Sequence, residues 1–251
     1  MFVLAMTWMS SCAAATIRAE KQKEIQAQYE RLRSEMGPAE RRWEEKLLAC
    51  LPDSQHLGLK LARVRGQSSV WDFVHDKPDL PRILLIGDSV SIGYTPIVRR
   101  ELEGKANVHR APRNCGGTQL AIKELSRWLG KKQWDLIHFN FGIHDHGTRL
   151  NSYRSNLEHI TDRLKTTGAK LIWANTTPIP DGWKASSGSI AARNAVATRV
   201  MNEKGVVIND LNSVIRPYLE TEQRPRDVHF KPAGRERLGK QVARVIAQHL
   251  D

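Results

Sequence analysis

The stretch that most constrains the fold runs from Ile83 to Ser91 and reads Ile-Leu-Leu-Ile-Gly-Asp-Ser-Val-Ser. Four branched apolar residues end abruptly at a glycine, an acid and a serine. A short continuous apolar run of this kind is typical of a parallel strand that is buried on both faces. Ligands of open α/β sheets bind beyond the carboxyl ends of the strands, so we expect Ser89 at such an end, just before a helix.

Ser89 has two interpretations at this point. Backbone N–H groups at the start of a helix are unpaired and favour negative charge. A serine held there could attack a carbonyl carbon and help to hold the resulting oxyanion, given a base and further donors. Serine and aspartate are also favoured helix N-caps, so Ser89 could instead serve only as a cap.

Strand-like and helix-like segments alternate after Pro81. Apolar runs predict further strands at 107–110, 135–141, 170–175 and 206–208, and helical spacing predicts helices at 95–102, 121–129, 153–164, 189–201 and 238–246. This alternation predicts an α/β fold, a parallel sheet of about five strands with helices on both faces. Each crossover is expected to be right-handed.

The residues before this domain, 19–80, read as a helical and irregular N-terminal extension. Apolar residues recur at helical spacing from Ile25 to Met36, Gly37-Pro38 interrupts the pattern, and a charged helical pattern resumes at 40–48. We expect an exposed helical appendage, and a partner-binding segment is the alternative. Residues 52–80 are expected to be irregular, with contacts to the main domain from Trp71, Phe73 and Val74.

Residues 1–18 resemble an export signal or lipoprotein segment. The apolar stretch Phe2–Met9 is followed by small residues, although no Lys or Arg precedes it. The sequence Met-Ser-Ser-Cys makes Cys12 a candidate lipid anchor. We therefore expect a secreted or periplasmic protein, or a cytoplasmic one if the segment is not a signal. No other stretch approaches the roughly 20 apolar residues that span a bilayer.

Composition excludes several classes of protein. The chain has 251 residues, 40% of them hydrophobic and 26% charged, which suits one folded α/β domain with additions. The net charge of +12 favours acidic partners, but the basic residues form no block or nucleic-acid motif, so no specific nucleic-acid partner is expected. The three cysteines form neither a disulfide framework nor a Cys-x-x-Cys pair. If Cys12 is removed or modified, Cys50 and Cys115 could pair, which their spacing does not decide, and we expect two unpaired thiols.

Four loops carry polar or glycine residues that core packing does not require. They contain Ser89, the pair Gly116-Gly117, the run Gly142–His146, and the run Arg226–Phe230 with His229. In a sheet of this kind these loops can meet at one edge. They would then supply a nucleophile, backbone donors, a side-chain donor and a base.

These four loops resemble, in order, four sequence blocks of the SGNH (GDSL-type) hydrolases. The first block is similar to Gly87–Ser91, the second to Gly116–Thr118, the third (usually Gly-x-Asn-Asp) to Gly142–Asp145, and the fifth (usually Asp-x-x-His) to Asp227–His229. The resemblance spans residues 81–251, which would form the SGNH hydrolase domain. It implies a flavodoxin-like, three-layer α/β/α sandwich.

The resemblance also implies a function. Ser89 would be the nucleophile, His229 the base that takes its proton, and Asp227 the acid that orients His229. The oxyanion hole would consist of the Ser89 and Gly116 N–H groups and the side chain of His144. The expected activity is that of a serine esterase without metal or cofactor, acting on acyl (most often acetyl) esters of carbohydrate. A lipid or lysophospholipid esterase and a non-catalytic glycan- or partner-binding module are the alternatives.

Two departures from the family pattern leave parts of the site open. Position 144 is histidine where the family has asparagine, although a ring N–H can also donate to an oxyanion. Asp227 stands two residues before His229 rather than three, so either Asp227 or a backbone carbonyl could orient the ring. The serine run also lacks the last glycine of Gly-x-Ser-x-Gly, which argues against the α/β-hydrolase family proper.

Simpler structural roles remain for each of these residues. Gly116 and Gly117 could be turn glycines, and His229 could be a surface residue at a helix start. The run 144–146 could bind a metal, although a closed site needs about four ligands. We expect Asp145 to be a structural acceptor within its loop. His138 alternates with the apolar residues of its strand, which is typical of a core histidine.

Overall fold

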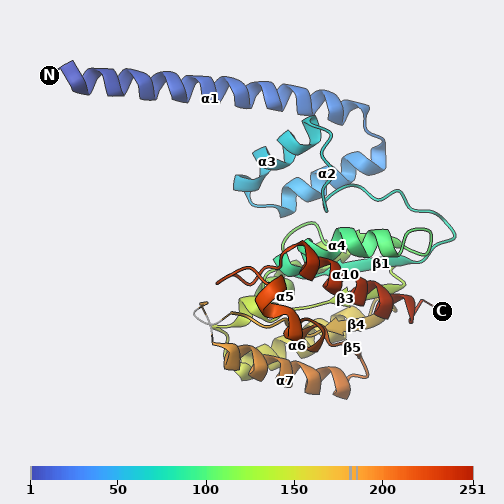
Figure 1. Ribbon diagram of the computed structural model, residues 1–251. Coiled ribbons are helices and arrows are strands. Elements are labelled where there is room, and N and C mark those ends of the chain that lie inside the picture. Colours follow the sequence, from blue (N-terminus) through green and yellow to red (C-terminus); the bar gives the residue numbers. More distant parts are fainter. Residues whose placement is uncertain (1, 181–182, 185, 251) are drawn as a thin grey trace. The chain divides into compact units, whose positions relative to one another are not determined.

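The computed structural model describes residues 2–180, 183–184 and 186–250. Their contacts divide the chain into two compact units, Met1–Phe73 and Val74–Asp251 (Figure 1). No helix in the described part of the chain combines the length and the hydropathy that crossing a membrane requires.

The N-terminal unit consists of three helices: α1 (Phe2–Glu35), α2 (Pro38–Cys50) and α3 (Asp53–Val64). The break between α1 and α2 falls at the predicted Gly-Pro interruption, where proline occupies the first turn of the second helix, a position that needs no backbone N–H. The expectation that residues 52–80 are irregular was wrong for α3. Leu59 of α3 is buried in an apolar cluster with Leu47 and Leu51, and this packing stabilises the helix.

Trp71 is partly buried and packs against the same cluster. A buried carboxylate lies nearby. Glu44 accepts hydrogen bonds from the Tyr29 hydroxyl at 2.9 Å and from Arg63 Nε at 2.9 Å. These bonds satisfy a charge that burial would otherwise make costly.

The second unit contains a five-stranded sheet of parallel strands in the order β2-β1-β3-β4-β5. The strands are β1 (Arg82–Ile86), β2 (Asn107–Arg110), β3 (Leu136–Phe139), β4 (Lys170–Ala174) and β5 (Val207–Asn209). The predicted parallel sheet of about five strands is therefore confirmed.

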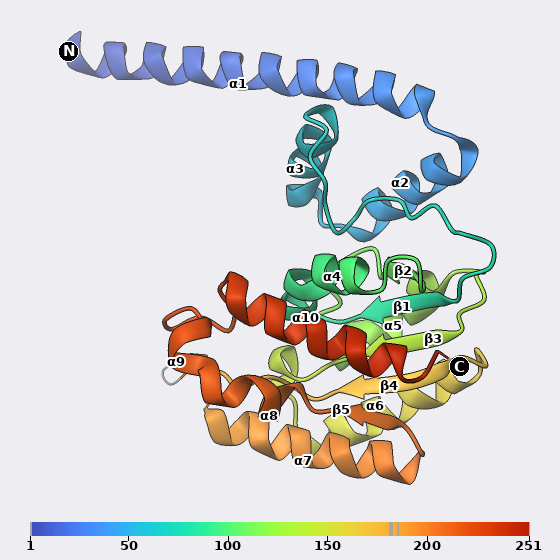
Figure 2. The ribbon, with the colours of Figure 1, turned by 45° about the vertical axis from the view of Figure 1, so that its right-hand side comes forward.

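Helices cover both faces of this sheet and form the outer layers of a three-layer α/β/α sandwich (Figure 2). One face is covered by α5 (Thr118–Leu129), α6 (Leu150–Lys165) and α7 (Ser187–Glu203), and the other by α4 (Ser89–Glu101), α8 (Leu211–Ile215) and α10 (Pro232–Ala247). Short turns complete the chain: η1 (Ile143–Asp145), η2 (Arg216–Tyr218) and α9 (Leu219–Glu222).

The apolar run of β1 supplies both cores. Leu84 and Ile86 face the core beneath α5 and α6, whereas Ile83 and Leu85 face the core beneath α4 and α10. This alternation follows from the two-residue period of a strand, and it explains why β1 reads as a continuous apolar run. His138 of β3 is fully buried, and its Nε2 lies 3.2 Å from Asn209 Nδ2, so it is a core histidine.

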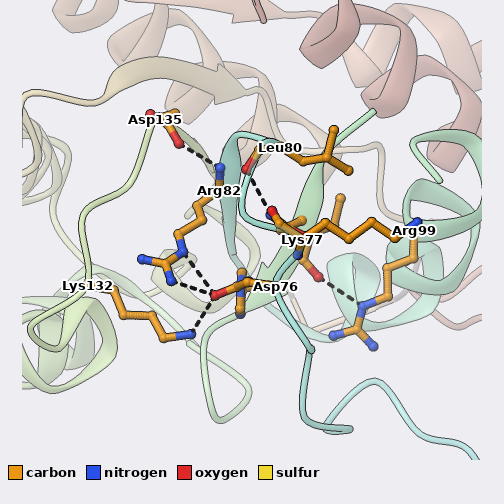
Figure 3. Close-up of polar contacts among 10 residues, drawn as sticks. Asp76, Lys77, Leu80, Arg82, Arg99, Lys132 and Asp135 are labelled. Atoms are coloured by element: carbon orange, nitrogen blue, oxygen red, sulfur yellow. Dashed lines mark hydrogen bonds and ion pairs between the residues drawn. The ribbon is translucent and has the colours of Figure 1, made fainter. Parts of the chain in front are cut away.

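The amino end of the sheet is tied down by the segment that enters β1 (Figure 3). Asp76 accepts hydrogen bonds from Arg82 Nε and Nη2 at 3.0 and 2.7 Å, and Lys132 Nζ lies 3.4 Å away. The Asn107 side chain donates to the carbonyls of Lys77 and Leu80 at 2.9 and 2.8 Å. The carboxyl ends of the strands point the other way, toward α9 and the start of α10 (Figure 2).

Candidate active site

Ser89 lies just beyond the carboxyl end of β1 and is the first residue of α4. The helix begins at Ser89, six residues earlier than predicted, and it accommodates Pro96 in its interior. Asp88 is the N-cap, because its Oδ1 accepts the Val90 N–H at 2.9 Å. The interpretation of Ser89 as only a cap is therefore wrong, and its hydroxyl is left for another partner.

That partner is His229. Its Nε2 lies 2.7 Å from Ser89 Oγ, although the two residues are separated by 140 positions in the sequence. His229 follows a tight turn in which Gln223 and Phe230 form an antiparallel bridge and the Arg224 N–H donates to the His229 carbonyl at 2.9 Å. Arg226 adopts a φ of 54° at this turn, a conformation that costs a residue with a Cβ about 1–2 kcal/mol.

Asp227 reaches His229 despite the short spacing. Its Oδ1 lies 2.6 Å from the ring Nδ1 and also accepts the backbone N–H of His229 at 3.2 Å. An aspartate that bonds to the backbone two residues ahead forms an Asx turn, which holds the carboxylate beside that residue. Burial opposes ionisation of this carboxyl, but the hydrogen bonds from His229 outweigh burial and lower the pKa of Asp227.

The three side chains form one directed chain of hydrogen bonds. An ionised carboxylate only accepts, so the proton of a neutral His229 ring is on Nδ1, and Nε2 is left to accept from the Ser89 hydroxyl. The side chains of His229 and Asp227 are 37% and 35% exposed, so the group opens to solvent. The arrangement can deprotonate Ser89 as the hydroxyl attacks an electrophilic carbon.

Gly116 and Gly117 both occupy positions that favour glycine for structural reasons. Gly116 has a φ of 58°, and a Cβ on Gly117 would lie 3.1 Å from both carboxylate oxygens of Asp145. The loop is linked to the serine turn because the Cys115 N–H donates to the Gly87 carbonyl at 3.1 Å. The Gly116 N–H donates to Asn114 Oδ1 at 3.0 Å, so this candidate oxyanion donor is engaged within its own loop.

His144 is exposed on η1 and faces an open pocket of about 300 Å³ beside the start of α5. Asp145 is buried and accepts from the Thr118 N–H at 3.0 Å and from its hydroxyl at 2.6 Å. It is therefore a structural acceptor, but for the start of α5 rather than for its own loop as predicted. The His146 ring contacts Trp183 edge-on at 5.6 Å.

The three side chains of the 144–146 run therefore have different surroundings. This arrangement does not suit the alternative in which they bind one metal ion together. Among the described residues, no group of three or more metal-binding side chains occurs. Cys50 and Cys115 are both buried thiols. Burial raises the pKa of Cys115 to about 11, so this thiol is a poor nucleophile.

Arg193 of α7 is a site residue that the sequence did not predict. Its side chain is buried and donates to the carbonyls of Asp145 at 2.8 Å and of His146 and Thr148 at 2.7 Å each. These bonds fix the loop that presents His144. In the sequence Arg193 looks like one more basic residue of an amphipathic helix, so no signal distinguished it.

Comparisons with known proteins identify the fold. No protein-family model matches the sequence, and no curated protein matches it significantly. Among solved structures, a lipase/acylhydrolase from Enterococcus faecalis is 22% identical with a TM-score of 0.62, and the match covers 68% of this chain and 98% of that one. A protein from Slackia heliotrinireducens assigned to the SGNH hydrolases is 18% identical with a TM-score of 0.56, over 67% and 100% of the two chains.

The acetylxylan esterase Axe2 from Geobacillus stearothermophilus is 16% identical with a TM-score of 0.58, over 66% of this chain and 94% of that one. Nearly the whole of each of these proteins is matched, and about two thirds of this chain is. The chain therefore has the fold of SGNH-type hydrolases and acetylxylan esterases, as its sequence blocks implied.

Proposed function

We propose that this protein is a serine esterase that removes acyl groups, most often acetyl, from carbohydrate. The observation that carries the proposal is the hydrogen-bonded chain from Ser89 Oγ through the His229 ring to Asp227, at the carboxyl edge of the sheet. Ligands of open α/β sheets bind at this edge. The SGNH-type fold supports the proposal, because its solved examples include proteins named as esterases and acylhydrolases.

The reaction follows from the direction of these hydrogen bonds. Ser89 Oγ forms a bond to the acyl carbon while His229 Nε2 takes the hydroxyl proton. The tetrahedral intermediate then expels the sugar alcohol, which leaves with the proton from His229. Water deprotonated by the same ring attacks the acyl-serine, and acetate is released as Ser89 regains its proton. Asp227 stabilises the ring each time the ring carries positive charge.

The oxyanion requires donors that point at the carbonyl oxygen. We assign this role to the Ser89 N–H at the start of α4, the Gly116 N–H and the His144 ring. The Gly116 N–H currently bonds to Asn114 Oδ1, so the oxyanion would have to replace that acceptor. His144 is exposed and does not pack in the core, so its ring is able to turn toward a substrate.

The choice of substrate rests on two considerations. Neighbours in fold include acetylxylan esterases, whose names state an acetylated polysaccharide substrate. In this chain, Val90 and Val228 flank Ser89 and His229 and pack with Ile143, Ile179 and Ile190 in one apolar cluster, which suits a small acyl group beside the nucleophile.

The test compares acyl chain lengths and a natural type of substrate. Purified protein is assayed with p-nitrophenyl acetate, butyrate and octanoate and with acetylated xylo-oligosaccharides, alongside Ser89→Ala. The matched control is Ser126→Ala, an exposed serine in the last turn of α5, at the end of the helix away from the Gly116 loop. We expect the acetyl esters to be the best substrates and Ser89→Ala alone to abolish turnover.

Other results would separate the alternatives. A preference for octanoate would favour a lipid esterase, the other activity suggested by the lipase/acylhydrolase neighbour. Binding of acetylated oligosaccharide without turnover of any ester would favour a non-catalytic module. Turnover that survives Ser89→Ala would remove the catalytic assignment altogether.

A further inference from the structure

A buried arginine lies directly beneath the turn that carries Ser89. Arg110 is the last residue of β2, and its side chain is 2% exposed. Its Nη2 donates to the carbonyls of Gly87 and Asp88 at 2.9 and 3.2 Å, and its Nη1 donates to Ser91 Oγ at 2.8 Å. The guanidinium therefore binds neutral oxygens on both sides of Ser89.

Such a placement is costly for a cation. Moving a charge out of water costs several kcal/mol unless hydrogen bonds compensate for the loss. An apolar side chain could fill the same volume, but it would leave the buried Asp88 carboxylate without this nearby positive charge. Lysine could not replace the forked donor set, because its ammonium is a single point charge. The burial of Arg110 therefore indicates a role that requires both a positive charge and the forked N–H donors of a guanidinium at this turn.

The Asp88 carbonyl is the acceptor that connects Arg110 to the chemistry. It accepts from Arg110 Nη2, from Ser91 Oγ at 2.7 Å and from the helical N–H of Ile92 at 3.1 Å. This carbonyl and the Ser89 N–H belong to the same peptide group. Hydrogen bonds to the oxygen of an amide polarise it and make its N–H a stronger donor. The Ser89 N–H is one of the oxyanion donors assigned above.

Arg110 also links the serine turn to the glycine loop. The Gly87 carbonyl accepts both Arg110 Nη2 at 2.9 Å and the Cys115 N–H at 3.1 Å. Gly87 itself is held close to Ser91, since a Cβ at Gly87 would lie 2.8 Å from Ser91 Oγ. The Gly87 carbonyl thus joins Arg110 to both loops that carry proposed oxyanion donors.

We propose that Arg110 is a positioning residue for Ser89, and that it polarises the Asp88–Ser89 peptide so that the Ser89 N–H binds the oxyanion more strongly. The inference rests on the proposed esterase function for its consequence in turnover. Its structural part, the polarised peptide, does not depend on activity. The two parts can therefore be measured separately.

The first measurement reports on hydrogen bonding at the Asp88–Ser89 peptide group. The sequence contains two Asp–Ser links, Asp53-Ser54 and Asp88-Ser89. Protein with carbonyl-¹³C aspartate and ¹⁵N serine gives one HNCO peak for each link, and the peak that Ser89→Ala removes is assigned to Asp88-Ser89. We expect Arg110→Met to shift this peak toward weaker hydrogen bonding in both the ¹³C and the amide ¹H dimension, and Arg110→Lys to shift it less. The Asp53-Ser54 peak is the internal control.

The second measurement reads turnover of p-nitrophenyl acetate. We expect Arg110→Met to lower kcat about 10-fold with little change in KM, because weakening a donor costs less than the roughly 10²–10³-fold loss from removing one. Arg110→Lys should recover part of this loss. The matched control is Arg99→Met, since Arg99 also joins α4 to β2, through a bond of 3.1 Å from its Nε to the Val108 carbonyl. The Arg99→Met variant should leave both kcat and the Asp88-Ser89 peak unchanged.

A smaller change keeps the test decisive if Arg110→Met does not fold. Ser91→Ala removes one of the two side-chain donors to the Asp88 carbonyl and leaves the helical N–H of Ile92. It should shift the same peak in the same direction, with a smaller loss of kcat. The proposal is overturned if the peak does not move in Ser91→Ala and Arg110→Lys, or if it moves while kcat holds. If the wild type hydrolyses no ester but the peak still shifts, the failure lies in the proposed function, and the polarised peptide stands.

Discussion

Asp227 and His229 are joined through one oxygen: Oδ1 of the carboxylate lies 2.6 Å from the ring Nδ1 and 3.2 Å from the backbone nitrogen of the same histidine. The backbone bond sets the position of the carboxylate, and the side-chain bond sets the orientation of the ring. The same turn therefore presents base and acid together. This geometry favours Asp227 over a backbone carbonyl as the group that orients His229.

Asp227→Asn tests this assignment. An asparagine side chain keeps the shape but can donate to Nδ1, which would place the ring proton on Nε2 and prevent it from accepting from Ser89. We expect kcat for p-nitrophenyl acetate to fall about 10³–10⁴-fold, as for the equivalent change in serine protease triads. Arg224→Gln is the control, because Arg224 Nη1 lies 3.9 Å from Asp227 Oδ2 on an exposed side chain. Retention of most activity in Asp227→Asn would instead indicate a Ser–His dyad.

His144 can be tested without endangering the fold because its side chain is exposed. If its ring donates to the oxyanion, His144→Ala should lower kcat about 10²–10³-fold with a small effect on KM. His144→Asn restores an N–H donor at the position and should recover most of the activity. Equal activity in wild type and His144→Ala would exclude His144 from the oxyanion hole.

Two glycines of the same loop should respond oppositely to alanine. A Cβ on Gly142 would lie 2.0 Å from Oγ1 of the buried Thr176, whereas a Cβ on Gly147 meets nothing within 4 Å. We expect Gly142→Ala to lower the free energy of unfolding by about 2–3 kcal/mol, as overpacking does. Gly147→Ala should change it by no more than about 0.5 kcal/mol. Urea unfolding of both variants measures the difference, and similar values would contradict the close packing of η1 against Thr176.

His138 predicts a pH dependence of stability. Burial lowers the pKa of His138 to about 3, whereas an unfolded histidine titrates near 6.5. Below about pH 6.5 the unfolded chain therefore takes up a proton that the folded protein excludes, so the free energy of unfolding falls with decreasing pH. Each excluded proton contributes up to about 1.4 kcal/mol per pH unit.

His138→Gln isolates this contribution, because the amide oxygen can still accept from Asn209. Between pH 6.5 and 4 the variant should lose stability less steeply than the wild type, by the slope of one proton. Above pH 7.5 the two curves should run parallel. Parallel curves over the whole range would show that His138 is not the source of the acid sensitivity.

The sequence predicted the sheet well because a short continuous run of apolar residues is typical of a strand that is buried on both faces. Leu84 and Leu85 belong to opposite cores. The short length of the run and the glycine that follows it favour a strand over a buried helix. The start of α4 was missed by six residues, since Pro96 and the β-branched Val90 and Ile92 weaken the helical pattern there. The helix begins at Ser89 because Asp88 caps it and the core covers it.

The site was harder to predict than the sheet. The short spacing from Asp227 to His229 made the acid uncertain, because no sequence pattern indicates the Asx turn that brings the two side chains together or the φ of 54° at Arg226 just before it. Arg110 and Arg193 were missed for a different reason. Basic residues are usually exposed, and their burial is visible only when the carbonyls that they satisfy are placed in space.

The most direct test of the account is the reactivity of Ser89 toward a fluorophosphonate, which forms a covalent adduct with a serine activated by a neighbouring base. Intact-protein mass spectrometry should show one phosphonyl group per chain, and peptide mapping should place it on Ser89. Labelling should vanish in Ser89→Ala and His229→Ala and persist in Ser126→Ala. Labelling at another residue, or none on folded wild-type protein, would contradict the claim that Ser89 and His229 form a nucleophile and its base.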